Sequence, residues 1–399
     1  MRILFLTPQM PYPPQKGTAL RNWGLIKGLA TKHDVAVLSF LDPGQTNVLA
    51  PHFLSVCRGE VISPPERTTR ARLLDIARTS APDMALRLAS DSYADRLRYW
   101  LIHEEFDVVH IEGIEMAPYM DIVAAAIRRS LIIFDDHNCE YLLQRRSFET
   151  DIRQVQRWPA AAYSFIQWKR LRRYEAEVCS RADRVIAVSD ADAAALHMIL
   201  PNAEIAVVPN GIDSTAYRPQ DSATQEESAI VFTGTMDFRP NIDAVLWFAQ
   251  EVLPAIKQKV PNIHLYIVGQ RPHNRLQCLM NNPSVTVTGW VEDPRPYIAS
   301  AAVYVVPLRV GGGTRLKLLE AMAMGKAVVS TRLGAEGYPV VDGQELVLAD
   351  SPEDFASAVV ELLNDPQWRR ALGEQGRAFV EQHYDWKSII PQVEALYYT

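Results

Sequence analysis

The chain has 399 residues, of which 48% are hydrophobic and 22% are charged, and its net charge is −6. These values favour two or three ordinary domains with substantial cores. Residues 1–215 carry 25 basic against 26 acidic side chains and residues 216–399 carry 16 against 21, so neither half resembles a nucleic-acid-binding protein. The four cysteines form no CxxC pair, which indicates neither a zinc site nor a disulfide framework and fits a reducing cytosol.

The amino-terminal stretch MRILFLTPQMPYPP is typical of a first strand that runs into a loop. It holds one basic residue and about five apolar residues before proline intervenes, which is too short for a signal peptide. No apolar run approaches the roughly 18 residues that span a bilayer. We therefore expect a soluble or peripheral protein in the cytoplasm.

Short apolar segments alternate with helix-length segments, which is the pattern of βαβ units around a parallel sheet. In the first half, the expected strands are 3–6, 35–40, 108–111, 131–134, 185–188 and 205–208. The polar stretch STAYRPQDSATQEES shows no periodicity and is interpreted as a linker. In the second half, the expected strands are 229–232, 264–268, 285–288, 303–306, 327–329 and 346–348.

This alternation predicts two consecutive doubly wound α/β domains. We expect an amino-terminal domain over 1–213, a linker over 214–228 and a carboxy-terminal domain over 229–375. The last helical segment, 376–399, is expected to pack back on the amino-terminal domain. Ligands bind beyond the carboxyl ends of the strands in such sheets, so the cleft between the domains is the expected active site.

The most informative chemical signal is the run VGGGTRLKLLEAMAMGKAVVST, residues 310–331. Its glycines allow the backbone to approach a ligand closely, and the amides of the helical turn that follows carry partial positive charge toward a bound phosphate. Arg315 and Lys317 add full positive charge, and Glu320 can accept hydrogen bonds from sugar hydroxyls. The combination favours a nucleotide-sugar site. The alternative is a glycine-rich turn that serves only strand-to-helix packing. The residues of the loop itself are Gly311, Gly312, Gly313 and Thr314.

Five segments make the chain resemble the GT-B glycosyltransferases, specifically glycosyltransferase family 4, over nearly its whole length. They are PYPPQKGTALRN, DDHNCEY, VIAVSDAD with VVPNGID, VFTGTMDFRPNIDAV, and VTVTGWVEDPRPYIASAAVYVVPLRVGGGTRLKLLEAMAMGKAVVST. The resemblance implies a retaining enzyme that uses a nucleotide-diphosphate sugar and needs neither a metal ion nor a cofactor. Within the family, the chain is most similar to bacterial sugar transferases of polysaccharide and exopolysaccharide loci.

The Glu-x7-Glu pair of the family is only half present. Glu320 matches the second acid, which binds the nucleotide ribose in the family, whereas the first position is occupied by Gly312. The resemblance therefore implies ribose binding by Glu320. Recognition of the sugar is left to other groups, such as the amides of Gly312 and Gly313, and the donor sugar stays open.

The segment TGTMDFRPN corresponds to the place where many relatives carry an arginine and a lysine that bind the diphosphate. Thr235, which follows Gly234, stands at the arginine position, and Arg239 lies one residue out of step with the lysine position. The resemblance implies that Arg239 contacts phosphate. A surface salt bridge is the alternative.

The loop after the third strand of the second domain corresponds to the backbone groups that recognise the base in the family. In this chain the loop contains Trp290, Val291 and Glu292, and Gly269 flanks the same pocket at the end of the second strand. The alternative interpretation is that each of these residues only forms a turn between a strand and a helix. Because backbone contacts leave little side-chain signature, the sequence does not identify the nucleotide.

His137 in DDHNCEY follows an expected strand and therefore lies at the carboxyl edge of the first sheet. Relatives keep a histidine there beside the donor sugar, so the resemblance implies an active-site role for His137. The adjacent Asp135 and Asp136 suggest a metal site, but the nearby His and Glu lack settled ligand spacing and we expect no metal. A satisfied polar residue at a strand end is the alternative.

Gly17 lies in the loop between the first strand and a helix expected from about Thr18. Backbone amides there would face the donor phosphates from the opposite wall of the cleft. Arg21, one turn into the helix, either assists in donor binding or is solvated.

The stretch 145–184 is rich in basic and aromatic side chains. It holds ten basic residues against five acidic ones, interleaved with Trp158, Tyr163, Phe165, Trp168 and Tyr174. A helix of this kind can contact anionic lipid, which suits a lipid-linked acceptor. The alternative is a helix that packs on its own domain and leaves its basic face in water.

We expect a retaining, metal-independent glycosyltransferase of the hexosyltransferase type that moves a sugar to a hydroxyl of a glycan or glycolipid. Arg239, Arg315 and Lys317 would stabilise the leaving diphosphate, and His137 would orient the sugar. Two rival functions remain, a nucleotide-sugar epimerase on the same fold and a sugar-binding protein without turnover. A dinucleotide oxidoreductase is disfavoured because no GxGxxG follows the first strand.

Overall fold

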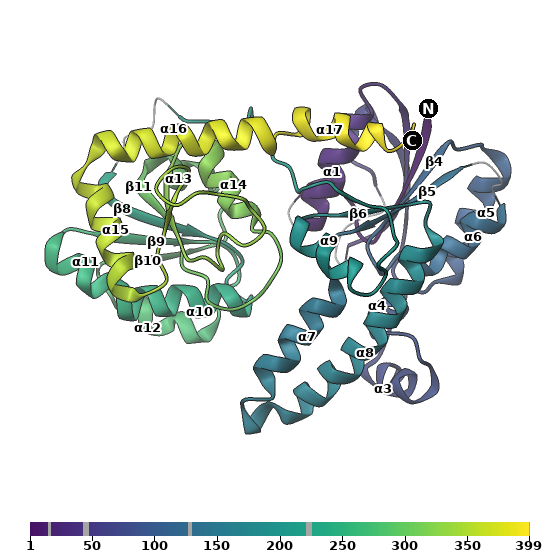
Figure 1. Ribbon diagram of the computed structural model, residues 1–399, viewed down its shortest axis with the longest axis horizontal. Helices are drawn as coiled ribbons and strands as arrows, with labels where there is room; N and C mark the ends of the chain where they lie inside the picture. Colours follow the sequence, from purple (N-terminus) through teal and green to yellow (C-terminus); the bar gives the residue numbers. More distant parts are fainter. Residues whose placement is uncertain (15–16, 43–47, 127–129, 221–225, 399) are drawn as a thin grey trace. The chain divides into compact units, whose positions relative to one another are not determined.

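The computed structural model describes residues 1–14, 17–42, 48–126, 130–220 and 226–398. Its contacts divide the chain into unit 1, which comprises Met1–Asn210 and Ile389–Thr399, and unit 2, which comprises Gly211–Ser388 (Figure 1). Each unit has its own parallel sheet covered by helices, so the prediction of two doubly wound α/β units is confirmed. Gln15 and Lys16 of the PYPPQKGTALRN segment lie outside the described residues.

The sheet of unit 1 has seven described strands, all parallel, in the order β3-β2-β1-β4-β5-β6-β7. Six of them coincide with predicted strands, whereas β3 was not predicted. It lies at the edge of the sheet, and all five of its residues are only partly buried, so it lacks a continuous apolar run. The strands are β1 (Arg2–Thr7), β2 (Asp34–Phe40), β3 (Arg58–Ile62), β4 (Val108–Glu112), β5 (Leu131–Asp136), β6 (Arg184–Ala187) and β7 (Ile205–Val207).

The centre of this sheet is buried on both faces. The last five residues of β1 and all five residues of β4 are buried, including the polar ones. The direction in which strands are added reverses between β1 and β4, and this reversal is the switch point at which such sheets bind ligands. Residues that follow β1, β4 and β5 are therefore the ones that the fold brings to a ligand.

Unit 1 has helices on both faces of its sheet and a helical hairpin formed by α7 and α8, which pack side by side (Figure 1). Thr68, Ser90 and Ser189 cap helices by accepting a hydrogen bond from an amide three residues further on. Short 3-10 turns span Ala117–Tyr119 and Val155–Arg157. The α-helices are α1 (Gly17–Leu29), α2 (Pro51–Val56), α3 (Thr69–Arg78), α4 (Asp83–Arg87), α5 (Asp91–His103), α6 (Met120–Ala126), α7 (Glu140–Asp151), α8 (Trp158–Arg181) and α9 (Asp190–His197).

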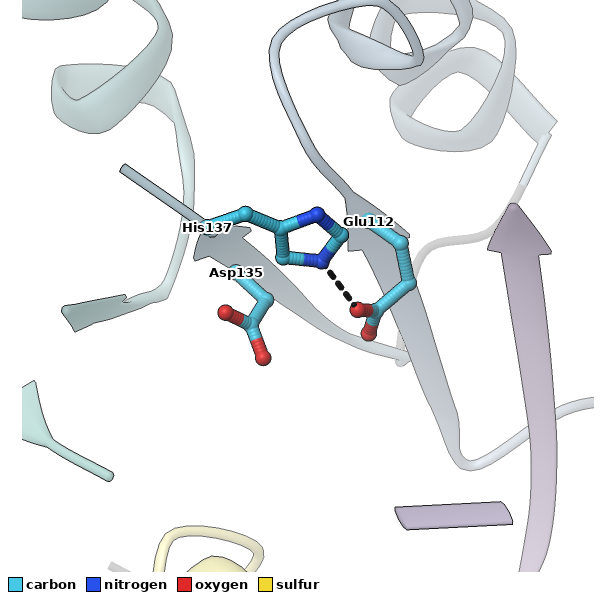
Figure 2. Close-up of side chains that lie close together, drawn as sticks. All are labelled: Glu112, Asp135 and His137. Atoms are coloured by element: carbon cyan, nitrogen blue, oxygen red, sulfur yellow. Dashed lines mark hydrogen bonds and ion pairs between the residues drawn. The ribbon is translucent and has the colours of Figure 1, made fainter. Parts of the chain in front are cut away.

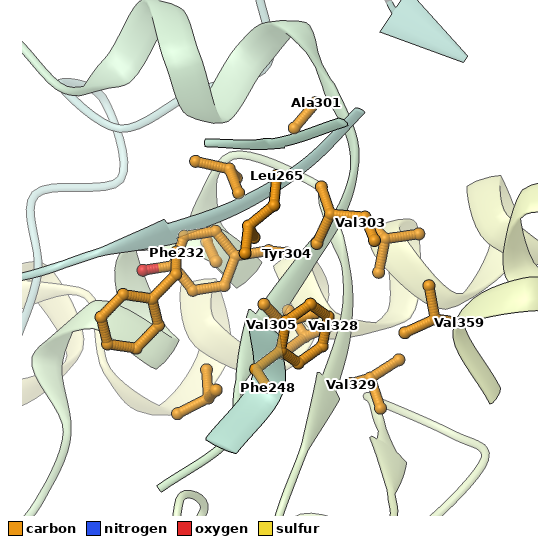
Figure 3. Packing of buried hydrophobic residues seen from close by; sticks show 14 of the residues in the cluster. Phe232, Phe248, Leu265, Ala301, Val303, Tyr304, Val305, Val328, Val329 and Val359 are labelled. Carbon is orange, nitrogen blue, oxygen red and sulfur yellow. The ribbon is translucent and has the colours of Figure 1, made fainter. Parts of the chain in front are cut away.

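The sheet of unit 2 has six described strands in the order β10-β9-β8-β11-β12-β13, and all six coincide with predicted strands. Side chains of β11 and β12, among them Val303, Val305, Val328 and Val329, form its core together with Phe248 (Figure 3). The switch point of this sheet lies between β8 and β11. The strands are β8 (Glu226–Thr233), β9 (His264–Val268), β10 (Val285–Gly289), β11 (Ala301–Val306), β12 (Ala327–Ser330) and β13 (Val347–Leu348).

The glycine run of unit 2 was predicted to lead directly into a helix, but in the structure it does not. Gly311 and Gly313 have φ angles of 107° and 80°, which a right-handed helix cannot include, and α14 begins only at Leu316. A π-helical segment spans Phe248–Val252 and a 3-10 turn spans Asn274–Leu276. The α-helices are α10 (Arg239–Trp247), α11 (Leu253–Lys259), α12 (Gln277–Met280), α13 (Arg295–Ser300), α14 (Leu316–Ala323), α15 (Pro352–Asn364) and α16 (Pro366–His383). No described helix in either unit has the length and apolar character needed to cross a membrane.

The predicted linker 214–228 is shorter in the structure than the sequence suggested. Ser214 is hydrogen-bonded to Asp385 within unit 2, and Glu226 already begins β8. Residues 221–225 of this stretch lie outside the described residues. The polar composition of 226–228 hid the start of the strand, because only residues from Ala229 onward are buried.

The carboxy-terminal segment 376–399 is divided between the two units. Arg377 of α16 donates to the carbonyl of Ala323 at the end of α14, and residues up to Ser388 belong to unit 2. From Ile389 onward, the last helix, α17 (Trp386–Ala395), belongs to unit 1. There Glu394 pairs with Lys32 at 2.8 Å, just after α1.

Candidate active site

Two glycines at the carboxyl ends of β8 and β9 let the backbone of unit 2 pack unusually closely. Gly234 and Gly269 both have a φ angle of 153°. A Cβ atom on Gly269 would lie 1.7 Å from the carbonyl oxygen of Gly234, so only glycine fits there. A Cβ atom on Gly234 would lie 2.7 Å from Nζ of Lys317. Gly234 thus leaves room for the Lys317 ammonium at the switch point.

Lys317 lies in the first turn of α14, and two neighbours hold its ammonium in place. Its Nζ donates to Oδ1 of Asn241 at 2.9 Å and lies 4.0 Å from the centre of the Phe232 ring. Burial lowers the pKa of Lys317 to about 7, although the negative charge of Glu320 opposes this. Its direct partners are a neutral amide and an aromatic ring, neither of which cancels its charge. This ammonium is well placed to bind an anion.

Glu320 lies three residues beyond Lys317 and therefore on the same face of α14. The hydroxyl of Tyr217 donates to its Oε1 at 3.3 Å. Burial raises the pKa of Glu320, and the positive charge of Lys317 opposes this shift. One face of α14 thus presents a cation next to a hydrogen-bond acceptor, which matches the phosphate and the ribose of a nucleotide.

In the loop between β11 and α14, Arg315 is hydrogen-bonded to the backbone of the same loop. Arg315 immediately precedes α14, and its Nη1 donates to the carbonyl of Gly312. Thr314 lies near the hydroxyl of Tyr338, whose pKa is raised by burial. The guanidinium of Arg315 also lies close to Gly311, because a Cβ atom on that glycine would be 3.4 Å from its Nη2. The glycines and Arg315 therefore form one local structure.

The remaining predicted positions of unit 2 follow strands β8 and β10 in the chain. Arg239 is the first residue of α10 and is exposed. The carbonyl of Thr235 accepts a hydrogen bond at 2.9 Å from the same asparagine that holds Lys317. After β10, Val291 packs on the core, Glu292 is exposed and Trp290 is 71% exposed.

In unit 1, His137 directly follows β5 and belongs to a chain of buried polar contacts. Its Nε2 lies 2.8 Å from Oε2 of Glu112, the last residue of β4 (Figure 2). The other carboxylate oxygen of Glu112 lies 3.3 Å from Nδ1 of His110, whose Nε2 is 2.8 Å from the hydroxyl of Tyr397. His110 and Glu112 thus connect the carboxy-terminal segment of the chain with His137.

These groups stabilise one another's charged forms. Burial raises the pKa of Glu112, but its contacts with His110 and His137 outweigh burial and lower this pKa to about 2. Burial lowers the pKa of His137, but its hydrogen bond to Glu112 and the charge of Asp135 outweigh burial and raise this pKa above its ordinary value. Because Nε2 of His137 is committed to Glu112, Nδ1 is the nitrogen that can donate to a ligand.

Arg21 has a role that the sequence analysis did not anticipate. Its side chain is buried rather than solvated, and its Nη2 pairs with Oδ2 of Asp135 at 2.7 Å. Its Nε also donates to Asp135, and its Nη1 donates to the carbonyls of Val208 and Pro209 at 3.1 Å each. All three guanidinium nitrogens are engaged within unit 1, so Arg21 holds β5 and the end of β7 together instead of binding a donor phosphate. Gly17 is the exposed first residue of α1.

Glu112, Asp135 and His137 offer ligand atoms that all lie within 4.8 Å of one another, a spacing compatible with a metal ion (Figure 2). The same atoms already have cationic partners. Asp135 receives two nitrogens of Arg21, and Glu112 binds the ring of His137. A divalent ion would have to displace Arg21 and compete with His137, so this arrangement fits an internal charge network better than a metal centre.

Both halves of the chain match known protein families. Residues 16–216 match Glycosyltransferase Family 4, and residues 227–365 match Glycosyl transferases group 1. The chain belongs to glycosyltransferase family 4. It is therefore a glycosyltransferase.

Relatives of this glycosyltransferase include a phosphatidyl-myo-inositol mannosyltransferase of Mycolicibacterium smegmatis. The two chains are 26% identical over 377 residues, which cover 92% of this chain and 86% of the relative.

Solved structures show that the fold is GT-B. Sucrose-phosphate synthase from Thermosynechococcus elongatus superposes with a TM-score of 0.74 at 20% identity, covering 100% of this chain and 98% of the other. HepE of Anabaena, in a complex with UDP and glucose, superposes with a TM-score of 0.67 at 17% identity and covers 100% of both chains.

Several residues at these sites of the glycosyltransferase escaped the sequence analysis. Asn241, Phe232 and Tyr217 contact Lys317 or Glu320, and Glu112 contacts His137. Glu112 had a detectable signal, because it is an acid at the carboxyl end of an apolar strand. Tyr217 had none, because it lies in the polar stretch interpreted as a linker.

Proposed function

We propose that this glycosyltransferase takes its sugar from a nucleotide-diphosphate donor and transfers it, with retention of the anomeric configuration, to a hydroxyl of a glycan or glycolipid in polysaccharide synthesis. The observation that carries the proposal is the pairing of Lys317 and Glu320 on one face of α14, at the switch point of unit 2. Lys317 would bind the diphosphate, and Glu320 would accept hydrogen bonds from the ribose hydroxyls.

Stabilisation of the leaving diphosphate is the main physical demand of this reaction. Negative charge grows on the diphosphate as the glycosidic bond breaks, and a cation already fixed beside it strengthens its interaction at that moment. Asn241 and the Phe232 ring hold the Lys317 ammonium in one position before any ligand arrives. Arg315 and Arg239 supply further positive charge, so we propose that neither a metal ion nor a cofactor takes part.

His137 is proposed to orient the donor sugar. Glu112 fixes the plane and the charge of its ring and leaves Nδ1–H as the donor toward a sugar hydroxyl. In a retaining transfer, the acceptor hydroxyl attacks the anomeric carbon on the same face of the sugar from which the phosphate leaves. The leaving phosphate also helps to remove the proton of that hydroxyl. The anomeric configuration of the product, determined by NMR, tests retention directly, and an inverted product would contradict it.

The donor can be identified with a panel of UDP-, GDP- and ADP-sugars. We expect one nucleotide class to bind and to be released as free nucleotide when an acceptor glycan is added. Nucleotide-sugar binding without acceptor-dependent release would instead support a sugar-binding protein. Conversion of the sugar without any acceptor would support an epimerase.

We also propose that the α7–α8 hairpin contacts an anionic membrane surface, which would bring a lipid-linked acceptor to the enzyme. Exposed apolar side chains gather where the two helices join: Ile152 is 46% exposed, Val155 is 70% exposed and Trp158 is 55% exposed. Arg153 and Arg157 lie between them in the sequence. Apolar side chains flanked by cations are typical of helices that insert shallowly into anionic lipid.

Vesicle co-sedimentation tests this contact. The protein should bind vesicles that contain phosphatidylglycerol more strongly than phosphatidylcholine vesicles, and salt should weaken the binding. Changing both Val155 and Trp158 to serine should abolish it. Met198→Ser is the matched control, because Met198 is 73% exposed in unit 1 outside the hairpin. Equal binding by both variants would contradict the proposal.

A further inference from the structure

The glycine loop of unit 2, residues 307–315, connects β11 to α14 without forming regular structure of its own. Gly311 and Gly313 adopt φ angles of 107° and 80°, and glycine has more backbone freedom to lose on ordering than any other residue. A loop that must be ordered when a ligand binds weakens the binding by the cost of ordering it. The contacts that hold this loop in the ligand-free protein therefore bear on donor binding.

One face of α10 supports the part of the glycine loop that leaves β11. Pro240, Asp243 and Trp247 lie on this helix at spacings of three and four residues, so their side chains share a face. A Cβ atom on Gly311 would lie 3.1 Å from Cγ of Pro240. The backbone of the loop thus packs closely on the first turn of α10.

Arg309 joins the glycine loop to this face through two kinds of contact. Its Nε donates to Oδ2 of Asp243 at 3.2 Å, and its Nη2 donates to Oδ1 of the same carboxylate at 3.1 Å. Two parallel hydrogen bonds fix the orientation of both groups. The guanidinium also lies over the Trp247 ring, 5.2 Å from its centre. Trp247 is 7% exposed and packs edge-on against Phe355, so the surface that receives Arg309 is part of the core.

The same helix also holds the chain beyond the glycines. Lys317 donates to Oδ1 of Asn241, and Nδ2 of Asn241 donates to the carbonyl of Thr235 at 2.9 Å. The chain is thus fixed to α10 before the glycines by Arg309 and after them by Lys317. Both anchors lie on one rigid element, so the glycines between them keep a defined place relative to α14.

We propose that Arg309 and Asp243 are positioning residues, which hold the glycine loop ready for the donor phosphate that bears the sugar without contacting the donor themselves. Glu320, Lys317 and the loop succeed one another toward the amino-terminal end of α14. A nucleotide whose ribose lies at Glu320 and whose diphosphate reaches Lys317 therefore presents its terminal phosphate to the loop. The inference rests on the proposed donor binding and adds a requirement for a preformed loop.

Hydrogen–deuterium exchange of the ligand-free, full-length protein tests the anchoring. Arg309→Met keeps an apolar side chain and removes the guanidinium. We expect the amides of residues 307–315 to exchange about three- to tenfold faster, the factor that corresponds to losing an exposed ion pair and a cation–π contact. Arg332→Met is the matched control, because Arg332 forms an exposed pair with Asp350 at 3.2 Å just after β12. It should leave exchange in 307–315 unchanged.

Calorimetry with a nucleoside diphosphate and the matching monophosphate tests the positioning, using the base that the donor panel selects. Arg309→Met and Asp243→Asn should each weaken diphosphate binding about three- to tenfold and change monophosphate binding less than about twofold, because only the diphosphate reaches the loop. The double variant should bind no more weakly than Arg309→Met alone, since both changes break one pair. Arg309→Lys restores the charge without the paired geometry and should recover part of the loss.

Steady-state kinetics separates these residues from Lys317. Ordering the loop costs the same in the ground state and in the transition state, so Arg309→Met should raise KM for the donor about three- to tenfold and leave kcat nearly unchanged. A fall in kcat without a change in KM would contradict a positioning role.

Three further results would overturn the inference. They are unchanged exchange of 307–315 in Arg309→Met, unchanged diphosphate affinity, and an equal loss of affinity for the monophosphate and the diphosphate. The wild-type protein separates this inference from the proposed function. If it binds the diphosphate and Arg309→Met binds equally well, only the positioning role is refuted. If the wild type binds no nucleotide at all, the proposed donor itself is refuted, and the role of Arg309 in donor binding is refuted with it.

Discussion

The polar residues at the switch points of the two units are organised in opposite ways. In unit 1, the charges around His137 are balanced internally, because Arg21 pairs with Asp135 and Glu112 lies between two histidines. In unit 2, Lys317 is held by a neutral amide and an aromatic ring, and burial lowers its pKa to about 7. The charges of the first network are paired within the protein, whereas the second network gains most when an anion binds.

This difference separates groups that hold the scaffold in shape from groups that await substrate. A buried ion pair contributes little net stability when it is intact but costs much when one partner is removed. A buried cation that has no direct ion-pair partner carries a desolvation cost that a bound phosphate can offset. Substitutions in unit 1 should therefore affect folding first, and substitutions in unit 2 should affect binding and turnover first.

Removal of Arg21 should have the largest effect. Arg21→Met leaves Asp135 buried and unpaired, and we expect the free energy of unfolding to fall by about 3–5 kcal/mol in urea denaturation. Replacing both partners, as in Arg21→Met with Asp135→Leu, should restore part of the loss. Arg145→Met breaks an exposed pair with Glu149 and should cost less than about 1 kcal/mol. Equal losses for Arg21→Met and Arg145→Met would show that the buried pair is not structural.

Removal of Lys317 should act on turnover while the protein stays folded. For Lys317→Ala we expect kcat to fall by about 100-fold or more, as when one preorganised electrostatic donor is deleted. Steady-state kinetics with the donor found in the panel measures the effect. Lys259→Ala, at an exposed position of α11, is the control. A near-normal kcat would leave Arg315 and Arg239 to carry the phosphate.

Glu320→Ala should weaken nucleotide binding by about 1.5–3 kcal/mol, the range for a hydrogen bond to a charged group. Isothermal titration calorimetry with the free nucleotide measures this loss. Tyr217→Phe removes only the hydroxyl that contacts Glu320 and should have a smaller effect. Unchanged nucleotide affinity in Glu320→Ala would rule out ribose binding by this acid.

The pKa of Lys317 predicts a pH dependence of donor binding. The pKa is lowered to about 7 in the free protein, so Lys317 is charged below pH 7 and neutral above it, whereas a bound diphosphate favours the charged form. Affinity for a nucleotide-sugar should be constant below about pH 6 and fall by up to about tenfold per pH unit above pH 7. Proton uptake, measured by calorimetry in buffers of different ionisation enthalpy, should accompany binding.

Lys317→Arg provides the control for this dependence, because arginine stays charged throughout the range. The variant should bind without proton uptake. Proton uptake that persists in Lys317→Arg would assign the titration to another group.

Chelation should have the smallest effect. Activity should survive thorough treatment with EDTA. In unit 1, Arg21 and His137 already contact the carboxylates of the possible metal cluster. In unit 2, cationic side chains are proposed to bind the diphosphate in place of a metal ion. Loss of activity that Mg²⁺ or Mn²⁺ restores would show that the cationic side chains do not suffice.

The amino-acid sequence determined the architecture because the signals of strands and helices are local. Among the described residues, apolar segments of strand length predicted every strand of unit 2 and all strands of unit 1 except β3, whose residues are half-buried at an edge. The sequence proposed Lys317 and Glu320 as site residues from their spacing after the glycines, and it proposed His137 from its place after a strand together with the family resemblance.

Tertiary structure alone decided what those residues touch. Arg21 and Asp135 are 114 positions apart, and Lys317 and Asn241 are 76 positions apart, so no local pattern relates them. The order of strands in each sheet brings these partners together, and burial then shifts the pKa of Lys317. Local propensity therefore specifies which elements form, whereas contacts between distant segments decide which charges are balanced and which await a ligand.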